Sequence, residues 1–163
     1  MNITNNGDDD IIYDCMEDMI LNDNDNIDYF DKGIVIWLPW PPTVNSYWKP
    51  VRNAIYLSRT GRLYKELVSE RVAEQVSDIK IPLDIGLLVE VTLYPPDNKG
   101  RDLDNYMKAL LDGITATKLW EDDKQIDQLF VYRGEVTKGG SVRVEIHESA
   151  PLMPIAHPND EKS

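Results

Sequence analysis

Cysteine, histidine and long hydrophobic runs are all scarce in this chain of 163 residues, which has one Cys and two His. Cys15 alone cannot form an internal disulfide, so a reducing compartment is expected. The apolar runs at 34–38 and 87–91 are far shorter than the roughly 18 to 20 residues that span a membrane. The N-terminus also lacks the basic start and apolar stretch of a signal peptide. We therefore expect a cytoplasmic protein with no membrane partner.

Basic residues are missing from the first thirty positions, which hold nine Asp or Glu and no Lys or Arg. The formal net charge of −12 therefore shrinks to −3 over residues 31–163, where 20 acids face 17 bases. With 42% hydrophobic residues, the rest of the chain is long enough for one domain with a core. We expect an acidic extension over 1–31 that is disordered alone, a single domain over 32–148, and a flexible tail over 149–163.

Hydrophobic periodicity predicts strands and helices in alternation. Strands are expected at 34–38, 54–57, 85–94, 126–133 and 142–147, and helices from Ser58 or Thr60 to about Asp78 and over 105–117. The first helix is expected to bury Leu63, Leu67, Val68, Val72 and Val76. Apolar residues on both sides of 126–133 are typical of a central strand. This order predicts an α+β fold, a mixed sheet backed by two main helices.

Carboxylates are concentrated in two short stretches, residues 100–108 and 121–123. If residues 101–104 are extended, Asp102 and Asp104 point to the same side. Asp104 can then cap the following helix, and Lys108 lies one turn along, beside these carboxylates. Each feature alone has a structural interpretation, as a helix cap, a surface ion pair or a polar turn. Their combination favours a bound cation, because like charges on one side of the backbone repel.

The residues available for binding that cation are oxygen ligands, which are typical of Mg²⁺. Cys15 lies in the extension, His147 in a predicted strand and His157 in the tail, so we do not expect zinc or a Cys or His nucleophile. Near the first strand, Tyr47 and Trp48 stand beside Lys49 and Arg52 in what is predicted to be an extended loop. Aromatics interleaved with bases can stack on and neutralise nucleic acid, although the same aromatics could simply cover the core.

Four segments together resemble a known family. They are Arg101-Asp102-Leu103-Asp104-Asn105 with Lys108 and Asp112, then Leu119-Trp120-Glu121-Asp122-Asp123-Lys124-Gln125-Ile126, and the flanking Leu38-Pro39-Trp40-Pro41-Pro42-Thr43-Val44-Asn45 with Thr137-Lys138-Gly139-Gly140. The chain resembles the RusA-type Holliday junction resolvases over about residues 34–148. The resemblance implies a homodimeric, magnesium-dependent endodeoxyribonuclease that cuts four-way DNA junctions symmetrically in recombination and repair.

The resemblance also assigns expected roles to single residues. Asp102 and Asp104 match the family's paired metal-binding aspartates, Asp123 its third essential carboxylate, and Lys108 its catalytic lysine. Asp122 matches a neighbouring acid and is a further candidate metal ligand. The candidate DNA-binding residues are Lys49, Arg52, Arg101 and Lys138. The expected chemistry is phosphodiester hydrolysis by water activated on one or two Mg²⁺ ions, with Lys108 neutralising the scissile phosphate.

Two other functions remain open at this point. One is a nuclease acting on other branched nucleic acids, because the surface rather than the chemistry selects the substrate. The other is a catalytically inactive DNA-binding module whose carboxylates hold a structural cation. The acidic extension likewise has two interpretations, either an inert solubilising arm or a DNA-like decoy for the basic surface.

Overall fold

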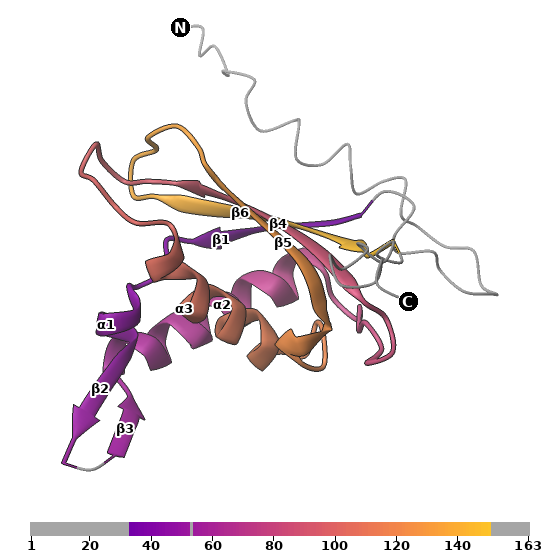
Figure 1. The fold of residues 1–163 in the computed structure, drawn as a ribbon, viewed down its shortest axis with the longest axis horizontal. Coiled ribbons are helices and arrows are strands. Elements are labelled where there is room, and N and C mark those ends of the chain that lie inside the picture. Colours follow the sequence, from indigo (N-terminus) through magenta and orange to yellow (C-terminus); the bar gives the residue numbers. More distant parts are fainter. Residues whose placement is uncertain (1–32, 53, 151–163) are drawn as a thin grey trace, which may run out of the picture.

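A four-stranded mixed sheet lies against two main helices in the computed structural model, which describes residues 33–52 and 54–150 (Figure 1). The strands follow the spatial order β1 (Ile34–Pro39), β6 (Ser141–Glu148), β4 (Leu87–Tyr94) and β5 (Ile126–Arg133). β6 pairs antiparallel with both β1 and β4, whereas β5 runs parallel to β4. The α+β class and the mixed sheet are therefore confirmed. The predicted extension at 1–31 and residues 151–163 of the predicted tail lie outside the described residues.

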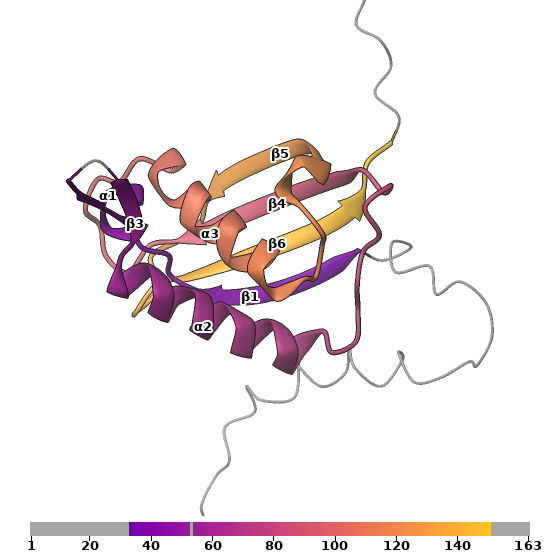
Figure 2. The same ribbon diagram turned by 90° about the horizontal axis from the view of Figure 1, so that it is seen from below.

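Both main helices, α2 (Arg59–Gln75) and α3 (Asp104–Thr117), cover the same face of the sheet (Figure 2). The loop predicted after β1 is instead a short helix, α1 (Val44–Tyr47), followed by β2 (Trp48–Val51). β2 pairs antiparallel with β3 (Ala54–Leu57) in a separate two-stranded sheet. A one-turn 3-10 helix, η2 (Asp123–Gln125), precedes β5. None of the helices in the described part is long and apolar enough to cross a membrane.

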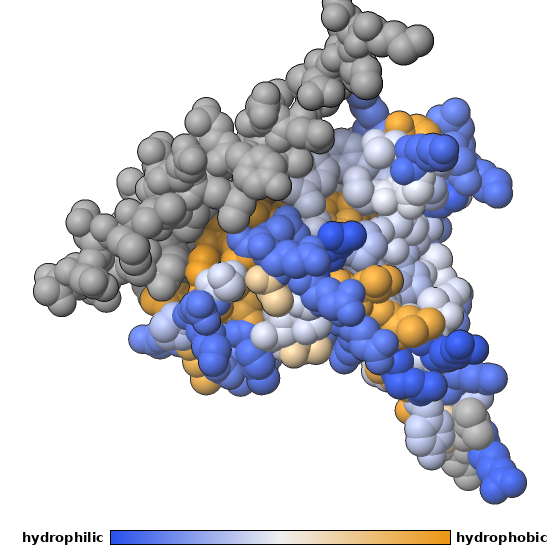
Figure 3. Space-filling model, turned by 180° about the vertical axis from the view of Figure 1, so that it is seen from behind, coloured by the Kyte–Doolittle hydropathy of each residue, from blue (hydrophilic) through white to orange (hydrophobic). Residues whose placement is uncertain are grey.

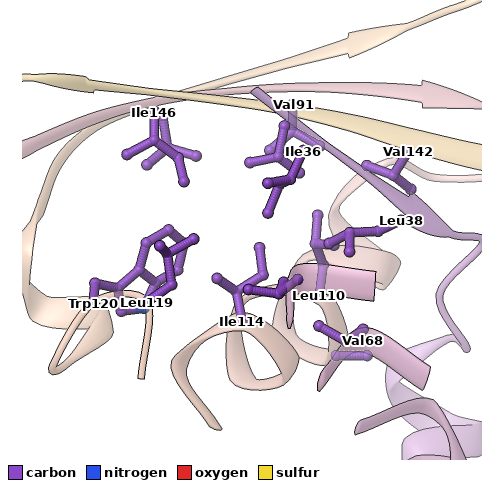
Figure 4. Close-up of a cluster of buried hydrophobic side chains, with 14 of the residues drawn as sticks. Ile36, Leu38, Val68, Val91, Leu110, Ile114, Leu119, Trp120, Val142 and Ile146 are labelled. Atoms are coloured by element: carbon purple, nitrogen blue, oxygen red, sulfur yellow. The ribbon is translucent and has the colours of Figure 1, made fainter. Parts of the chain in front are cut away.

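The core fills the space between the sheet and the two helices (Figure 4). β4 alternates as predicted, with Leu87, Val89, Val91 and Leu93 all 0% exposed. α3 contributes the predicted face, Tyr106, Leu110, Gly113 and Ile114, together with Ala109. The connection from α3 to β5 adds Trp120, which is also 0% exposed. The burial of Trp120 matters for the site, because it fixes the chain immediately before the acidic residues 121–123.

The buried face of α2 differs from the predicted one. Its buried residues are Gly61, Tyr64, Val68 and Val72. Leu63 and Leu67 are instead 48% and 47% exposed. A Cβ at position 61 would lie 2.8 Å from the Tyr47 carbonyl oxygen, so Gly61 permits a close approach that turns this face inward. The helix also ends at Gln75, before the predicted Asp78, where the Gln75 amide bonds to both backbone groups of Trp37.

β5 occupies the edge of the sheet, so its prediction as a central strand is wrong. It pairs only with β4, and Leu129, Phe130 and Tyr132 are between 41% and 48% exposed. This strand has apolar residues on both sides because some of them face solvent in the isolated chain, and not because the strand is buried between two layers.

Candidate active site

The two aspartates of the first acidic stretch lie at the start of α3. Leu103 has helical dihedral angles, φ −65° and ψ −36°, so the predicted extended alternation from Asp102 to Asp104 is wrong. Asp104 is the first helical residue rather than the cap, and Leu103 at the cap position makes no side-chain capping bond. Asp104 gains from the positive end of the helix dipole instead. Asp102 accepts a 3.5 Å hydrogen bond from the Asn105 side chain, and both aspartates are exposed.

Lys108 connects the two acidic stretches. Its Nζ lies 2.7 Å from Asp112 Oδ1 and 3.7 Å from Asp123 Oδ2. Lys108 was predicted to lie beside Asp104, but it lies between Asp112 and Asp123 instead. Two carboxylates attract the ammonium more strongly than a single one. The hydrogen bond to Asp112, followed by the charges of Asp112 and Asp123, raises the pKa of Lys108. The Lys108 side chain is still 53% exposed, so a substrate can reach it.

Trp120 and Gln125 fix the corner that carries the second acidic stretch. Trp120 donates its indole N–H to Thr115 Oγ1 at 2.6 Å. The Gln125 amide is 4% exposed and donates to the carbonyls of Pro82 and Ile85, at 2.7 and 3.1 Å. Its oxygen accepts from the backbone N–H groups of residues 121 and 122. This corner is therefore rigid on the side facing Lys108.

Asp122 is part of that corner as a helix cap. Its side chain accepts from the Lys124 backbone N–H at 3.0 Å, and Gln125 completes a capping box around η2. That backbone hydrogen bond is the main reason that the pKa of Asp122 is lowered. The role of Gln125 was missed in the sequence, although Asp and Gln three residues apart are the signature of a capping box.

The candidate site residues carry the type of ligand atom that a hard cation prefers. Asp102, Asp104 and Asp123 offer only carboxylate oxygens, and Mg²⁺ is commonly held by one or two carboxylates, several waters and substrate phosphates. Across residues 33–52 and 54–150, no three Asp, Glu, His or Cys side chains are gathered closely enough to hold a metal ion by themselves. The described residues thus present two exposed aspartates at the start of α3 and a lysine paired with Asp112 and Asp123, without a preformed cage of three ligands.

Arg101 organises the loop before α3. Its guanidinium donates to the Asp97 carboxylate at 2.5 Å and to the carbonyls of Asp97 and Lys99. It also lies 5.8 Å from the centre of the Trp40 ring, within the range of a cation–π contact. The side-chain hydrogen bond from Arg101, followed by one from the Lys99 backbone N–H, lowers the pKa of Asp97 to about 2. The predicted DNA-binding role of Arg101 stays a prediction, and the side chain, 15% exposed, already has partners within the loop.

The other predicted DNA-binding residues lie in two places. Lys138 is exposed on the turn between β5 and β6, which contacts the same loop through a Thr137 N–H bond to the Pro95 carbonyl at 2.9 Å. Lys49 and Arg52 are exposed on the separate β2–β3 hairpin. Lys138 therefore lies on a turn bonded to the start of the loop that precedes α3, whereas Lys49 and Arg52 lie on a separate hairpin.

Comparisons with known proteins identify the family of this chain. A family model described as "Endodeoxyribonuclease RusA" matches residues 39–147. The chain belongs to the RusA family. It is 34% identical over 113 residues to "Crossover junction endodeoxyribonuclease RusA" of Escherichia coli (strain K12), a match that covers 69% of this chain and 92% of that protein. It is 36% identical over 113 residues to the protein of the same name from Enterobacteria phage HK97, covering 68% of this chain and 91% of the relative.

The RusA family match includes every candidate site residue. It runs from the last residue of β1 to the penultimate residue of β6. The hairpin with Lys49 and Arg52, the Arg101 loop, Lys108 and the corner with Asp123 all lie within it. Residues 1–38 and 148–163 lie outside the match.

Proposed function

We propose that this chain is a magnesium-dependent endodeoxyribonuclease that resolves four-way DNA junctions in the cytoplasm during recombination and repair. The observation that carries the proposal is the 3.7 Å pair between Lys108 and Asp123, which unites two acidic stretches separated by most of a helix. The similarity to proteins named crossover junction endodeoxyribonucleases supports the substrate. The purely carboxylate donor set supports the cation.

Each residue has a part in the proposed hydrolysis. Asp102, Asp104 and Asp123 would hold the ion, with Asp122 beside them. When bound, Mg²⁺ lowers the pKa of a water and stabilises charge on phosphate oxygens. The Lys108 ammonium, steadied by Asp112, neutralises the scissile phosphate, for which a compact and movable cation is well suited.

We also propose that the enzyme acts as a homodimer. A four-way junction has approximate two-fold symmetry, and its resolution needs two matching nicks. Two subunits with one site each satisfy this requirement. Light scattering of the protein bound to junction DNA should give the mass of two chains, and a mass of one chain would contradict the proposal.

Replacing Asp102 by Asn tests the catalytic proposal. The variant should lose cleavage of a four-way junction in Mg²⁺ and retain junction binding, because the fold does not depend on this exposed side chain. Asp84→Asn, also at an exposed aspartate but on the loop before β4, is the matched control and should cut like the unmodified protein. Cleavage by the Asp102→Asn variant at the unmodified rate would remove Asp102 from the mechanism.

Two alternative functions are decided by the same assay. Nicking of fork, flap or RNA substrates in preference to the junction would identify a nuclease of other specificity. Tight junction binding without nicking at any Mg²⁺ concentration would identify a DNA-binding module, with the Lys108 pairs as structural contacts.

A further inference from the structure

The segment that contains the β2–β3 hairpin has an unusual charge. Residues 33–65 contain no Asp or Glu, in a chain whose formal net charge is −12. The five bases in this segment are Lys49, Arg52, Arg59, Arg62 and Lys65. A basic region of this kind within an acidic protein favours a polyanionic partner.

The hairpin projects from the body (Figure 1 and Figure 3), and its strand pairing gives it two different faces. Cross-strand partners point to the same side of a sheet. Pro50 pairs with Ile55 and Trp48 with Leu57, which gives one apolar face. Lys49 pairs with Tyr56, so the opposite face joins a base to an aromatic ring that is 57% exposed.

The apolar face forms an open pocket of about 550 Å³ together with α1. Its lining is Val44, Asn45, Trp48, Pro50 and Ile55. Ile55 is 71% exposed, the highest value among the large hydrophobic residues that are exposed in the described part of the chain. A two-stranded hairpin gains little stability alone, so such exposed apolar surface at its tip is typical of a binding surface.

We propose that this pocket binds a nucleobase unstacked at the branch point of the junction, while Lys49 and Arg52 contact the flanking phosphates. The inference rests on the proposed function and names the part of the DNA that the hairpin contacts. A flat heterocycle suits an apolar pocket, because every base has a face that stacks on apolar or aromatic side chains. Asn45 supplies an amide that can bond to a base edge.

Two considerations favour an unpaired base at a branch point over other occupants. Unstacking a base costs least where pairing is already interrupted, whereas intact duplex offers the hairpin only its phosphates. A two-fold contact between the hairpins of two copies would bring two acid-free basic segments together, and their like charges would repel. DNA supplies the opposite charge instead.

Ile55→Asn tests the pocket with little risk to the fold, because this side chain lies outside the core. The matched control is Leu83→Asn, at an exposed leucine, 53% exposed, on the loop before β4. Each full-length protein is titrated onto a four-way junction with 2-aminopurine at the branch point, and onto the matching linear duplex, without divalent ions. Fluorescence of 2-aminopurine reports unstacking, and anisotropy of a distant dye reports binding.

The unmodified protein and Leu83→Asn should raise the 2-aminopurine signal on binding the junction. Ile55→Asn should reduce that rise and weaken junction affinity by about 5-fold or more, a loss comparable to removing one stacked base, while leaving duplex affinity within about 2-fold. Lys49→Ala should weaken both substrates alike and reduce the slope of log affinity against log salt by about one.

Three results would overturn the inference. Ile55→Asn could bind the junction as Leu83→Asn does, or it could lower the affinity for junction and duplex equally. It could also convert a dimer to a monomer in light scattering, which would make the pocket a surface between copies. In each case the unmodified protein still cuts junctions in Mg²⁺. Failure of the unmodified protein to bind or cut junctions would instead refute the proposed function.

Discussion

Removing the hydroxyl of Tyr47 should stabilise the protein. Tyr47 is 0% exposed, and its hydroxyl has no hydrogen-bond partner among the described residues. Burial, together with the charge of Asp112, raises the pKa of this phenol, so it stays neutral. An unpartnered buried hydroxyl costs about 1–3 kcal/mol. Tyr47→Phe keeps the ring, including its edge contact with Trp48 at 5.2 Å, and should therefore raise the free energy of unfolding by about 1 kcal/mol or more.

Tyr64→Phe is the matched control, with the opposite expected sign. Tyr64 is 4% exposed, but its hydroxyl donates to the Pro39 carbonyl at 3.3 Å. Losing that bond should lower the free energy of unfolding by about 0.5–1.5 kcal/mol. Urea titrations followed by tryptophan fluorescence give both values under the same conditions. If Tyr47→Phe destabilises the protein as much as Tyr64→Phe, the Tyr47 hydroxyl has a partner, and its description as unsatisfied is wrong.

Three further predictions concern charged groups. Asp112→Asn should change the free energy of unfolding by less than about 1 kcal/mol, because the Lys108 side chain in its ion pair is 53% exposed. The same variant should slow junction cleavage at least about 10-fold. Cleavage at the unmodified rate would show that Lys108 needs no anchor. Because the pKa of Asp97 is lowered to about 2, its pair with Arg101 stabilises the loop above the ordinary carboxyl range and is lost as pH falls through that value. Asp97→Asn should flatten the acid limb of a tryptophan fluorescence titration, and an unchanged limb would exclude this pair as its source. Deleting residues 1–30 should leave junction affinity unchanged across a salt series if the extension is an inert arm, whereas tighter binding at low salt would identify a decoy.

The sheet and the main helices were predictable where one face of an element is buried. β4 shows strict alternation because Leu87, Val89, Val91 and Leu93 share its buried face, and the face of α3 follows helical spacing because that face is buried too. β5 was wrongly predicted as a central strand because the pattern of apolar residues in a sequence does not distinguish an edge strand with exposed apolar side chains from a strand covered on both sides. On α2, three- and four-residue spacing fits two neighbouring stripes, and the close approach at Gly61 decides between them.

The candidate site was predictable in its residues more than in its geometry. The spacing of the acids and the lysine is a property of the sequence, but the position of Lys108 depends on which carboxylates tertiary structure brings near it. Asp123 lies 3.7 Å from the ammonium because Trp120 bonds to Thr115 on α3 and Gln125 bonds to Pro82, 43 positions earlier. The helical conformation of Leu103 is likewise not determined by the presence of Asp102 and Asp104 on either side of it.

The parallel pairing of β4 and β5 has a consequence for the order of folding. α3 and the corner with Asp123 form the crossover between these neighbouring strands, so the contacts described for Lys108 and for this corner join residues at most 43 positions apart. At the other edge of the sheet, β1 and β6 join residues more than a hundred positions apart. Closing a long loop is entropically costly and slow. The unit that carries the candidate site should therefore form early on the folding pathway, with β1 added last, and slow folding variants should map to β1 and β6 rather than to the acidic site.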